Sequence, residues 1–356
     1  MKLLAGYVSR TVLGAMLLVL VLLLGLEMVF AFLGELEELR GRYTALEALA
    51  YIGLTAPQRL YGMLPLAALI GGIVGLGMLA GASELTVMRA AGVSIRRIVW
   101  WVLRPALLLI VLGLLLGQYV VPHTQKTAET RRALALEQTY LAGWLNSYWH
   151  REGDDMVRIG RVEPDGVLYD MVFFRLAPEG RLTAGTRIER GYYIPALGGW
   201  RLLNLRETRL RPDGTTEVLQ TPERFWPSRL TPEFLGLVTL EPETLSLTRL
   251  YLYAGYMKQQ GLDSAAYFLE FWKKALAPFA TLSMVLIACS FIFGPLRSVT
   301  MGLRILAGIM AGLLFRYAQD FLGYVSLIYD FSPLLAAGLP IAACLLLGGV
   351  AISRVR

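Results

Sequence analysis

The segment that decides the fold is residues 11–34, TVLGAMLLVLVLLLGLEMVFAFLG, in which Glu27 is the one charged residue. A hydrocarbon layer of about 30 Å is crossed by roughly 20 apolar helical residues, so this segment can span a membrane. A cleaved signal peptide is the alternative interpretation. Its apolar run would be only about 7–15 residues long and would end at a small-residue cleavage site, whereas the polar sequence ELEELRGR follows here at 35–42. We therefore expect a retained transmembrane helix.

Five further apolar segments of similar length follow, so the sequence predicts six transmembrane helices. These segments are residues 57–80, 99–121, 275–293, 302–322 and 333–353. The composition agrees, because the chain is 56% hydrophobic and 17% charged, whereas soluble domains are about 25% charged. The predicted fold class is a membrane α-helical protein with three helices, an inserted domain and three more helices.

The basic residues lie at the ends of the predicted spans and gather on one side of the membrane. Those on that side are Lys2, Arg10, Arg89, Arg96, Arg97, Arg104, Arg297, Arg304, Arg354 and Arg356, against the single acid Glu84. Short cytoplasmic segments are enriched in Lys and Arg, so we expect both termini in the cytoplasm and the inserted domain outside. Because the bases mark span ends, the net charge of +7 does not indicate binding to nucleic acid.

The inserted segment differs in composition from the helices on either side. Apolar and polar residues alternate in MVRIGRV (156–162) and WRLLNLRETRL (200–210), and the turn sequences PDG, PEG and GG separate such runs. This pattern is typical of antiparallel strands in a sandwich or roll. We predict transmembrane helices in residues 1–122, an all-β domain in residues 123–268, and transmembrane helices in residues 269–356.

The cytoplasmic segment SELTVMRAAGVSIRR (83–97) is predicted to form a short helix, with Ser83 at its start and Gly92 as a stop signal. Leu85 and Met88 give it an apolar side, whereas Glu84 and Arg89 are polar. One interpretation is a helix that lies on anionic lipid. The other is a helix inserted into a groove of a cytoplasmic partner, which Glu84 favours because anionic lipid would repel it.

Charged residues within the predicted spans are candidates for function, because a charge in hydrocarbon is costly. They are Glu27, Arg316 and Asp320. Arg316 and Asp320 are four residues apart on one helix face and could pair. Such a self-neutralising pair and a contact to substrate are both open interpretations.

A basic cluster is expected at the outer membrane face. Its members are Arg59, Lys126, Arg131, Arg132, Lys273 and Lys274. The simplest interpretation is snorkelling to lipid headgroups. The alternative is a ring of cations that receives a phosphorylated amphiphile, with Arg131, Arg132 and Lys274 as candidate headgroup ligands.

The sequence has no G-x-x-x-x-G-K-[ST] phosphate-binding loop. We therefore expect no nucleotide site, no cofactor and no enzymatic activity in this chain, so that any ATP hydrolysis takes place on another polypeptide. Cys289 and Cys344 fall within predicted spans, and His123 and His150 are isolated. No disulfide in the inserted domain and no metal site are expected.

Two motifs at matching positions resemble a known family. The run LGMLAGASELTVMRAAGVS (76–94) and the later run SFIFGPLRSVTMGLR (290–304) are similar to the LptF/LptG permeases of the lipopolysaccharide export ABC transporter. The FGPLRS loop, Phe234-Leu235-Gly236 and FLGYVSLIYDFSP (321–333) resemble the LptG branch of that family. The resemblance covers essentially the whole chain.

The resemblance implies a permease in the bacterial inner membrane that takes lipopolysaccharide from the outer leaflet towards a periplasmic bridge. It implies an LptF-like second permease, an LptB-like ATPase dimer that binds ATP and magnesium, and an LptC-like membrane-anchored protein as partners. It also implies a periplasmic β-jellyroll. The segment with Glu84, Leu85, Met88 and Arg89 matches the family's coupling helix, which docks into the ATPase.

The chain departs from the family at the outer end of the first span, where LptG proteins often carry lysines that meet lipid phosphates. Ala31, Glu37 and Glu38 stand near those positions here. Arg40 and Arg42, or the pair at 131–132, are candidates to replace those lysines. A permease for another envelope lipid or lipoprotein, and a membrane scaffold without transport, remain the alternative functions.

Overall fold

The computed structural model describes residues 2–354 except 40–41, 137–147, 153–154, 163–166, 178–179, 212–213, 229, 233–234, 236–241, 260–263 and 295–298. The chain divides into a helical unit, residues 1–132 and 242–356, and a sheet unit, residues 133–241. The predicted features at Arg40, Phe234, Gly236, Pro295, Arg297 and Arg356 lie outside the described residues.

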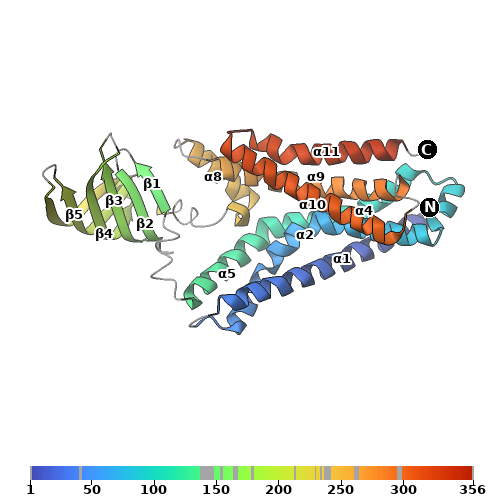
Figure 1. The fold of residues 1–356 in the computed structure, drawn as a ribbon, viewed down its shortest axis with the longest axis horizontal. Helices are drawn as coiled ribbons and strands as arrows, with labels where there is room; N and C mark the ends of the chain where they lie inside the picture. The colour runs from blue at the N-terminus through green and yellow to red at the C-terminus, as the bar shows by residue number, and fades with distance from the viewer. Residues whose placement is uncertain are drawn as a thin grey trace. The chain divides into compact units, whose positions relative to one another are not determined.

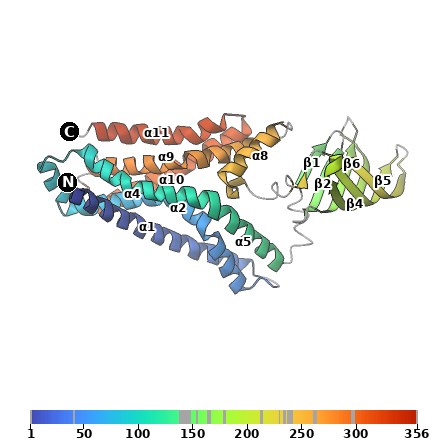
Figure 2. The same cartoon turned by 180° about the vertical axis from the view of Figure 1, so that it is seen from behind.

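The helical unit contains six helices that are long and apolar enough to cross a membrane, as the sequence predicts. They are α1 (Lys2–Glu37), α2 (Ala45–Gly81), the continuous run of α4 (Ile95–Leu115), a π-helical turn (Leu116–Val120) and α5 (Val121–Ala135), then α9 (Ala265–Phe293), α10 (Met301–Ile328) and α11 (Pro333–Ser353). Short elements complete the unit: α3 (Glu84–Ala90), a 3-10 turn (Pro242–Thr244) and α8 (Leu247–Gln259). Figures 1 and 2 show the long helices running side by side.

Glycines allow a close helix contact in this unit, between α1 and α2. A Cβ atom added at Gly71 would meet the backbone of Met16, and one added at Gly75 would lie 2.8 Å from the Cα of Val12. Helices in lipid gain little from hydrophobic burial against each other and associate through close packing at small residues. The run GGIVGLG at 71–77 therefore allows the close helix packing that its composition predicts.

The sheet unit is an antiparallel sheet of six strands in sequential order. The strands are β1 (Tyr148–Glu152), β2 (Asp155–Val162), β3 (Leu168–Leu176), β4 (Leu182–Ile194), β5 (Gly199–Leu210) and β6 (Thr216–Pro227). The prediction of an inserted all-β domain is confirmed. The described strands form a meander, because each pairs with the next strand along the chain. Gly180, Gly198 and Gly214 occupy three of the turns between strands with positive φ.

A row of irregular positions crosses this sheet from β2 to β6. Backbone pairing between neighbouring strands is missing at four opposed positions. These are Gly160/Asp170, Asp170/Glu189, Glu189/Asn204 and Asn204/Pro222. Asp170 and Asn204 have left-handed backbones, with φ of 51° and 55°, and a Cβ at Gly160 would lie 2.8 Å from the carbonyl oxygen of Asp170. Interrupted pairing of this kind bends strands and increases their twist. We call this row the crease.

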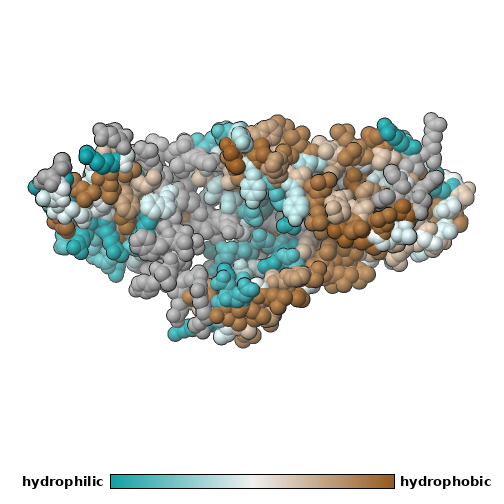
Figure 3. Space-filling model, in the orientation of Figure 1, coloured by the Kyte–Doolittle hydropathy of each residue, from teal (hydrophilic) through white to brown (hydrophobic). Residues whose placement is uncertain are grey.

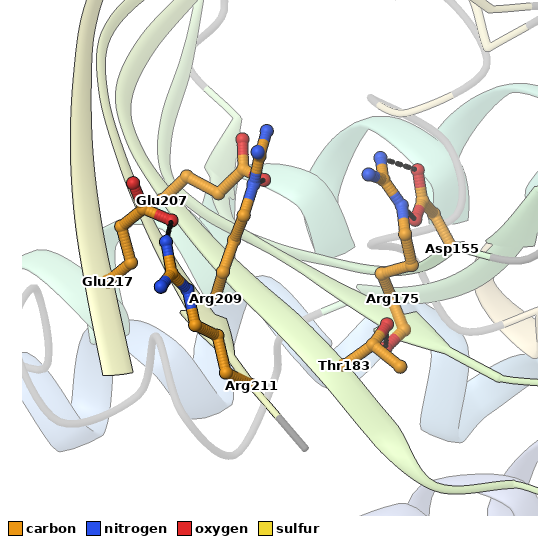
Figure 4. A network of polar contacts seen from close by, with 7 residues as sticks. All are labelled: Asp155, Arg175, Thr183, Glu207, Arg209, Arg211 and Glu217. Carbon is orange, nitrogen blue, oxygen red and sulfur yellow. Dashed lines mark hydrogen bonds and ion pairs between the residues drawn. The ribbon is translucent and has the colours of Figure 1, made fainter. Parts of the chain in front are cut away.

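Ion pairs lie between neighbouring strands and along one strand near one end of the sheet (Figure 4). Arg175 binds Asp155 directly opposite on the neighbouring strand at 3.0 Å, and Arg209 binds Glu207 two residues away at 2.6 Å. The hydrogen bond from Arg209 lowers the pKa of the Glu207 carboxyl below its ordinary value. Ion pairs at the protein surface contribute only about 0–1 kcal/mol each, and these pairs are partly exposed, so the buried face of the sheet supplies most of its stability.

The boundaries between the parts differ from the predicted ones. Residues 123–132 and 242–268, which the prediction gave to the β domain, belong to the helical unit. The reason is continuity of the backbone, because α5 prolongs the third span and α8 packs against α9. The β domain is therefore shorter, and both of its connections to the spans begin as helices.

We predict that Asn204→Val destabilises the sheet by about 1–3 kcal/mol, because a β-branched residue is strained in a left-handed backbone. Asn204→Gly keeps that backbone and loses only the exposed hydrogen bond that Asn204 donates to Glu189 at 2.7 Å. Hydrogen exchange of the β4 and β5 amides in the full chain should therefore speed up in the valine variant and stay near the original rate in the glycine variant. Equal exchange rates in the two variants would contradict a backbone role for this position.

Candidate functional site

A cavity of about 670 Å³ lies inside the helical unit. Its wall combines residues of α1, α2, α4, α5, α9 and α10 with Glu243 of the 3-10 turn. Four acids and four bases line it: Glu27, Glu243, Glu270, Asp320, Arg59, Lys273, Lys274 and Arg316. On the face drawn in Figure 3, hydrophilic residues gather at the end of the unit near α5 and α8, while hydrophobic residues cover most of the rest of the helices on that face.

The first ion pair of the cavity joins α1 to α2. The guanidinium of Arg59 donates to a carboxylate oxygen of Glu27 at 2.9 Å, and its Nε donates to the hydroxyl of Thr55 at 3.4 Å. Both partners are partly open, with 42% of the Glu27 side chain and 26% of the Arg59 side chain exposed. The pair neutralises two charges that would otherwise be costly at this depth.

The two adjacent lysines of α9 have different partners. Lys273 binds Glu270 at 2.7 Å. Lys274 is buried and donates to the carbonyl oxygens of Glu243 and Leu245, both at 2.7 Å. These carbonyls belong to the segment that enters α8, so Lys274 fixes that segment to the span. Its ammonium also lies 5.9 Å from the centre of the Tyr61 ring.

Arg316 and Asp320 face the same cavity from α10. Both are exposed, and the structure records no ion pair between them, although both lie in the described part of the chain. The self-neutralising pair, one of the two interpretations left open by the sequence, is therefore not formed between these two residues. Among the charged cavity residues that the structure describes, Arg316 is the base without a bound carboxylate or carbonyl, which leaves its guanidinium available to an anion.

Two amide side chains add unsatisfied polar groups to the cavity wall. The Oε1 atoms of Gln58 and Gln125 are buried and have no hydrogen-bond partner among the described residues. Gln125 is only 8% exposed, and its Nε2 donates to Glu129 at 2.9 Å. A buried acceptor without a partner costs about 1–3 kcal/mol, so a ligand or water that donates a hydrogen bond would be stabilised here.

The pair Arg131 and Arg132 lies outside this cavity. Arg132 binds Glu35 of α1 at 3.1 Å and lies 5.2 Å from the centre of the Tyr51 ring, whereas Arg131 is exposed. Tyr43 donates to the same Glu35 carboxylate at 2.8 Å. Burial, together with this hydrogen bond, raises the pKa of Tyr43 to about 12, so the phenol stays protonated and the contact persists near neutral pH.

The predicted site residues are grouped in the structure differently from how the sequence analysis grouped them. Lys274 lies with Glu27, Arg316 and Asp320 at one cavity, apart from the two arginines. Gln58, Gln125 and Glu270 were not predicted. For Glu270 the signal was present, since it stands three residues before Lys273 on one helix face. The pairing of Glu27 with Arg59 depends on the spatial approach of two spans and has no local signal.

The helix α3 is shorter than the predicted segment 83–97. It ends at Ala90, Gly92 has a φ of 84°, and Ile95 already begins α4. Ser83 occupies the N-cap position, as expected, and its carbonyl oxygen accepts from the backbone N–H of Val87 at 3.0 Å. Its backbone is left-handed, and its side chain makes no capping hydrogen bond. A left-handed turn on each side isolates α3 as a separate seven-residue helix.

The apolar side of α3 faces the chain's own bundle. Leu85 is 4% and Met88 is 6% exposed, and both belong to the core cluster of the spans. Val87 is 66% exposed, and Arg89 is exposed on the outer surface of the helix. The carboxylate of Glu84 accepts a hydrogen bond from the Tyr7 hydroxyl at 3.1 Å, which ties α3 to α1.

No metal site is indicated by the described residues, since no group of three or more His, Cys, Asp or Glu side chains among them is arranged to hold a metal ion. The functional features of the helical unit are therefore a charge-balanced cavity and a short helix anchored in the bundle. A cavity that contains paired and available cations inside apolar spans is suited to an amphiphilic anion.

Comparison with known proteins gives one consistent result. The family model described as lipopolysaccharide export system permease LptF/LptG matches residues 6–354. The lipopolysaccharide export system permease protein LptG of Escherichia coli strain K12 is 33% identical over 342 residues, which cover 96% of this chain and 95% of that protein. The LptG of Haemophilus influenzae is 33% identical over 337 residues, covering 94% of this chain and 93% of that protein.

We predict that Lys274→Met lowers the stability of the full chain in detergent, because it leaves two carbonyl oxygens unsatisfied at about 1–3 kcal/mol each. Arg316→Met should leave the melting temperature nearly unchanged, since Arg316 has no ion pair in the described structure. A thermal unfolding measurement on both variants checks this. Equal melting temperatures would show that the two bases have the same structural role.

Proposed function

The chain belongs to the LptF/LptG family of lipopolysaccharide export system permeases, and on that premise we propose that its cavity receives the phosphorylated headgroup of lipopolysaccharide. The family makes the chain a permease subunit of the lipopolysaccharide transporter and a multi-pass protein of the inner membrane. The proposal concerns the route of the lipid and the residues that meet it.

The observation that supports this proposal is the set of bases within an apolar bundle. Phosphate oxygens accept charge-assisted hydrogen bonds from guanidinium and ammonium groups, which are roughly twice as strong as neutral ones. Arg316 is available for such a bond, and Arg59 and Lys273 become available when their carboxylate partners are displaced. The exposed apolar surface of α1 and α10 suits acyl chains or lipid.

The energy for extraction comes, in this proposal, from a partner ATPase that binds ATP and magnesium. The helix α3 is the proposed contact, with Glu84, Arg89 and Val87 on or near the partner surface. Leu85 and Met88 anchor α3 in the core of the spans, so a force on α3 is passed to the bundle by packed side chains. A coupling helix needs such an anchor as much as it needs an exposed surface.

The proposed assembly follows the family. A second permease of the LptF type pairs with this chain, an LptB-like ATPase dimer lies on the cytoplasmic side, and an LptC-like protein receives the lipid. Both termini are then cytoplasmic and the sheet unit is periplasmic. The excess of bases at the α3 end of the spans supports that orientation.

We predict that a photoreactive amino acid at Tyr324 crosslinks to lipopolysaccharide in the assembled transporter. Tyr324 lines the cavity and is 67% exposed, so its replacement should not disturb packing. The same probe at Leu346, which is 68% exposed on α11 and outside the cavity lining, is the matched control. Crosslinking that is equal at the two positions would contradict a specific cavity and favour general contact with lipid.

We also predict that Glu84→Ala reduces the amount of ATPase that copurifies with the chain, since truncating a charge in such an interface costs about 2–5 kcal/mol. Tyr7→Phe is the control, because it removes the hydroxyl that contacts Glu84 and leaves the carboxylate in place. It should retain the ATPase. If both variants lose the ATPase to the same extent, Glu84 acts by holding α1 and does not contact the partner.

A further inference from the structure

The two halves of α1 are held to the protein by different forces. Its buried residues extend from Ala5 to Leu20, and no residue after Leu20 is buried in the part of α1 that the structure describes. Leu22, Leu26 and Phe30 are exposed. Fully buried apolar residues therefore fix the first half of the helix, whereas the second half combines partly buried apolar residues such as Leu23 with polar contacts.

Two carboxylates of that second half make polar contacts to other helices. Glu27 binds Arg59 of α2 at 2.9 Å, and Glu35 binds Arg132 of α5 at 3.1 Å. Both contacts are carboxylate–guanidinium ion pairs, but only one of them lies at the cavity. Glu27 and Arg59 line the cavity, whereas neither Glu35 nor Arg132 does.

Charge balance limits what the cavity can bind. With four acids against four bases among its described lining residues, it has no net positive charge to attract a phosphate. Arg59 can bind an external anion with full strength only when Glu27 leaves it. Thr55 holds the Nε of Arg59 at 3.4 Å, and Glu27 is the more exposed partner, at 42% against 26%. The carboxylate is therefore the partner with more room to move away, while Thr55 keeps the guanidinium at the wall.

The unpaired amide oxygens supply an independent sign of a ligand. The Oε1 atoms of Gln58 and Gln125 are buried in the same cavity without a partner among the described residues, and Gln58 directly precedes Arg59. A headgroup that carries both phosphate and hydroxyl groups could satisfy both features, since its phosphate accepts from arginine and its hydroxyls donate to the amides.

We propose that Glu27 is an internal counterion that occupies Arg59 in the empty cavity and is displaced when the phosphate of a lipid headgroup binds. The inference rests on the proposed function, of which it specifies the regulation. Binding becomes an exchange of one anion for another on the same guanidinium, so the affinity for the headgroup is the difference between two ion pairs. Return of the Glu27 carboxylate then assists release of the lipid.

The test measures the affinity of the assembled transporter for phosphorylated lipid A and for the same lipid after removal of its phosphates. Glu27→Gln should tighten binding of the phosphorylated lipid about tenfold, equivalent to about 1.4 kcal/mol, and leave the dephosphorylated lipid unchanged. Slower dissociation should account for the gain, so transport per ATP hydrolysed should fall.

Three further variants separate this role from a structural one. Arg59→Gln should weaken binding of the phosphorylated lipid and abolish the gain from Glu27→Gln in the double variant. Glu27→Asp, whose shorter side chain reaches Arg59 less well, should give a smaller gain in the same direction. Glu35→Gln removes the comparable contact of α1 outside the cavity and should leave the affinity unchanged.

The outcomes are distinct. Weaker or unchanged binding in Glu27→Gln, an equal gain for the dephosphorylated lipid, or an equal gain in Glu35→Gln would overturn the counterion role while leaving the proposed function intact. Competition by inorganic phosphate at concentrations comparable to the lipid would identify a free anion as the ligand and overturn the headgroup assignment. If the unaltered transporter binds neither lipid, the proposed function fails and this inference fails with it.

Discussion

A charge placed in hydrocarbon costs free energy unless it meets an opposite charge, a hydrogen-bond partner or water, and this constraint orders the helical unit. The long helices satisfy their own backbone groups, so they can pack through small residues such as Gly71 and Gly75, where a Cβ would strike α1. Eight charged side chains of the described residues are collected at one cavity. There, Glu27 neutralises Arg59 and carbonyl oxygens surround the ammonium of Lys274.

The same constraint makes the cavity suited to exchanging one anion for another on its bases, rather than to attracting an anion by a net positive charge. Its bases are already bound to groups of the chain, apart from Arg316 among the described residues. A phosphorylated lipid would replace contacts that exist, which keeps the cavity stable when empty and limits how tightly the lipid is held. A transporter benefits from such a balance, because a ligand bound too strongly leaves slowly.

Left-handed backbone residues shape two further parts of the chain, the short helix α3 and the sheet. Left-handed residues on both sides of α3 separate it from the spans, while Leu85 and Met88 keep it in their core. In the sheet, the crease through Asp170 and Asn204 bends a simple meander.

The sequence by itself determined the six spans, the inserted β domain and the family, because hydrophobic length, alternation and the motifs at 76–94 and 290–304 are local properties. It also identified Glu27, Arg316, Asp320 and Lys274 as charged residues within or beside the spans that are candidates for function. Only the tertiary structure decided their partners. Arg59 meets Glu27 although the two are 32 residues apart, and Lys274 meets carbonyls 31 and 29 residues away. Such contacts depend on how whole helices approach one another, and no pattern within a single helix encodes that distance.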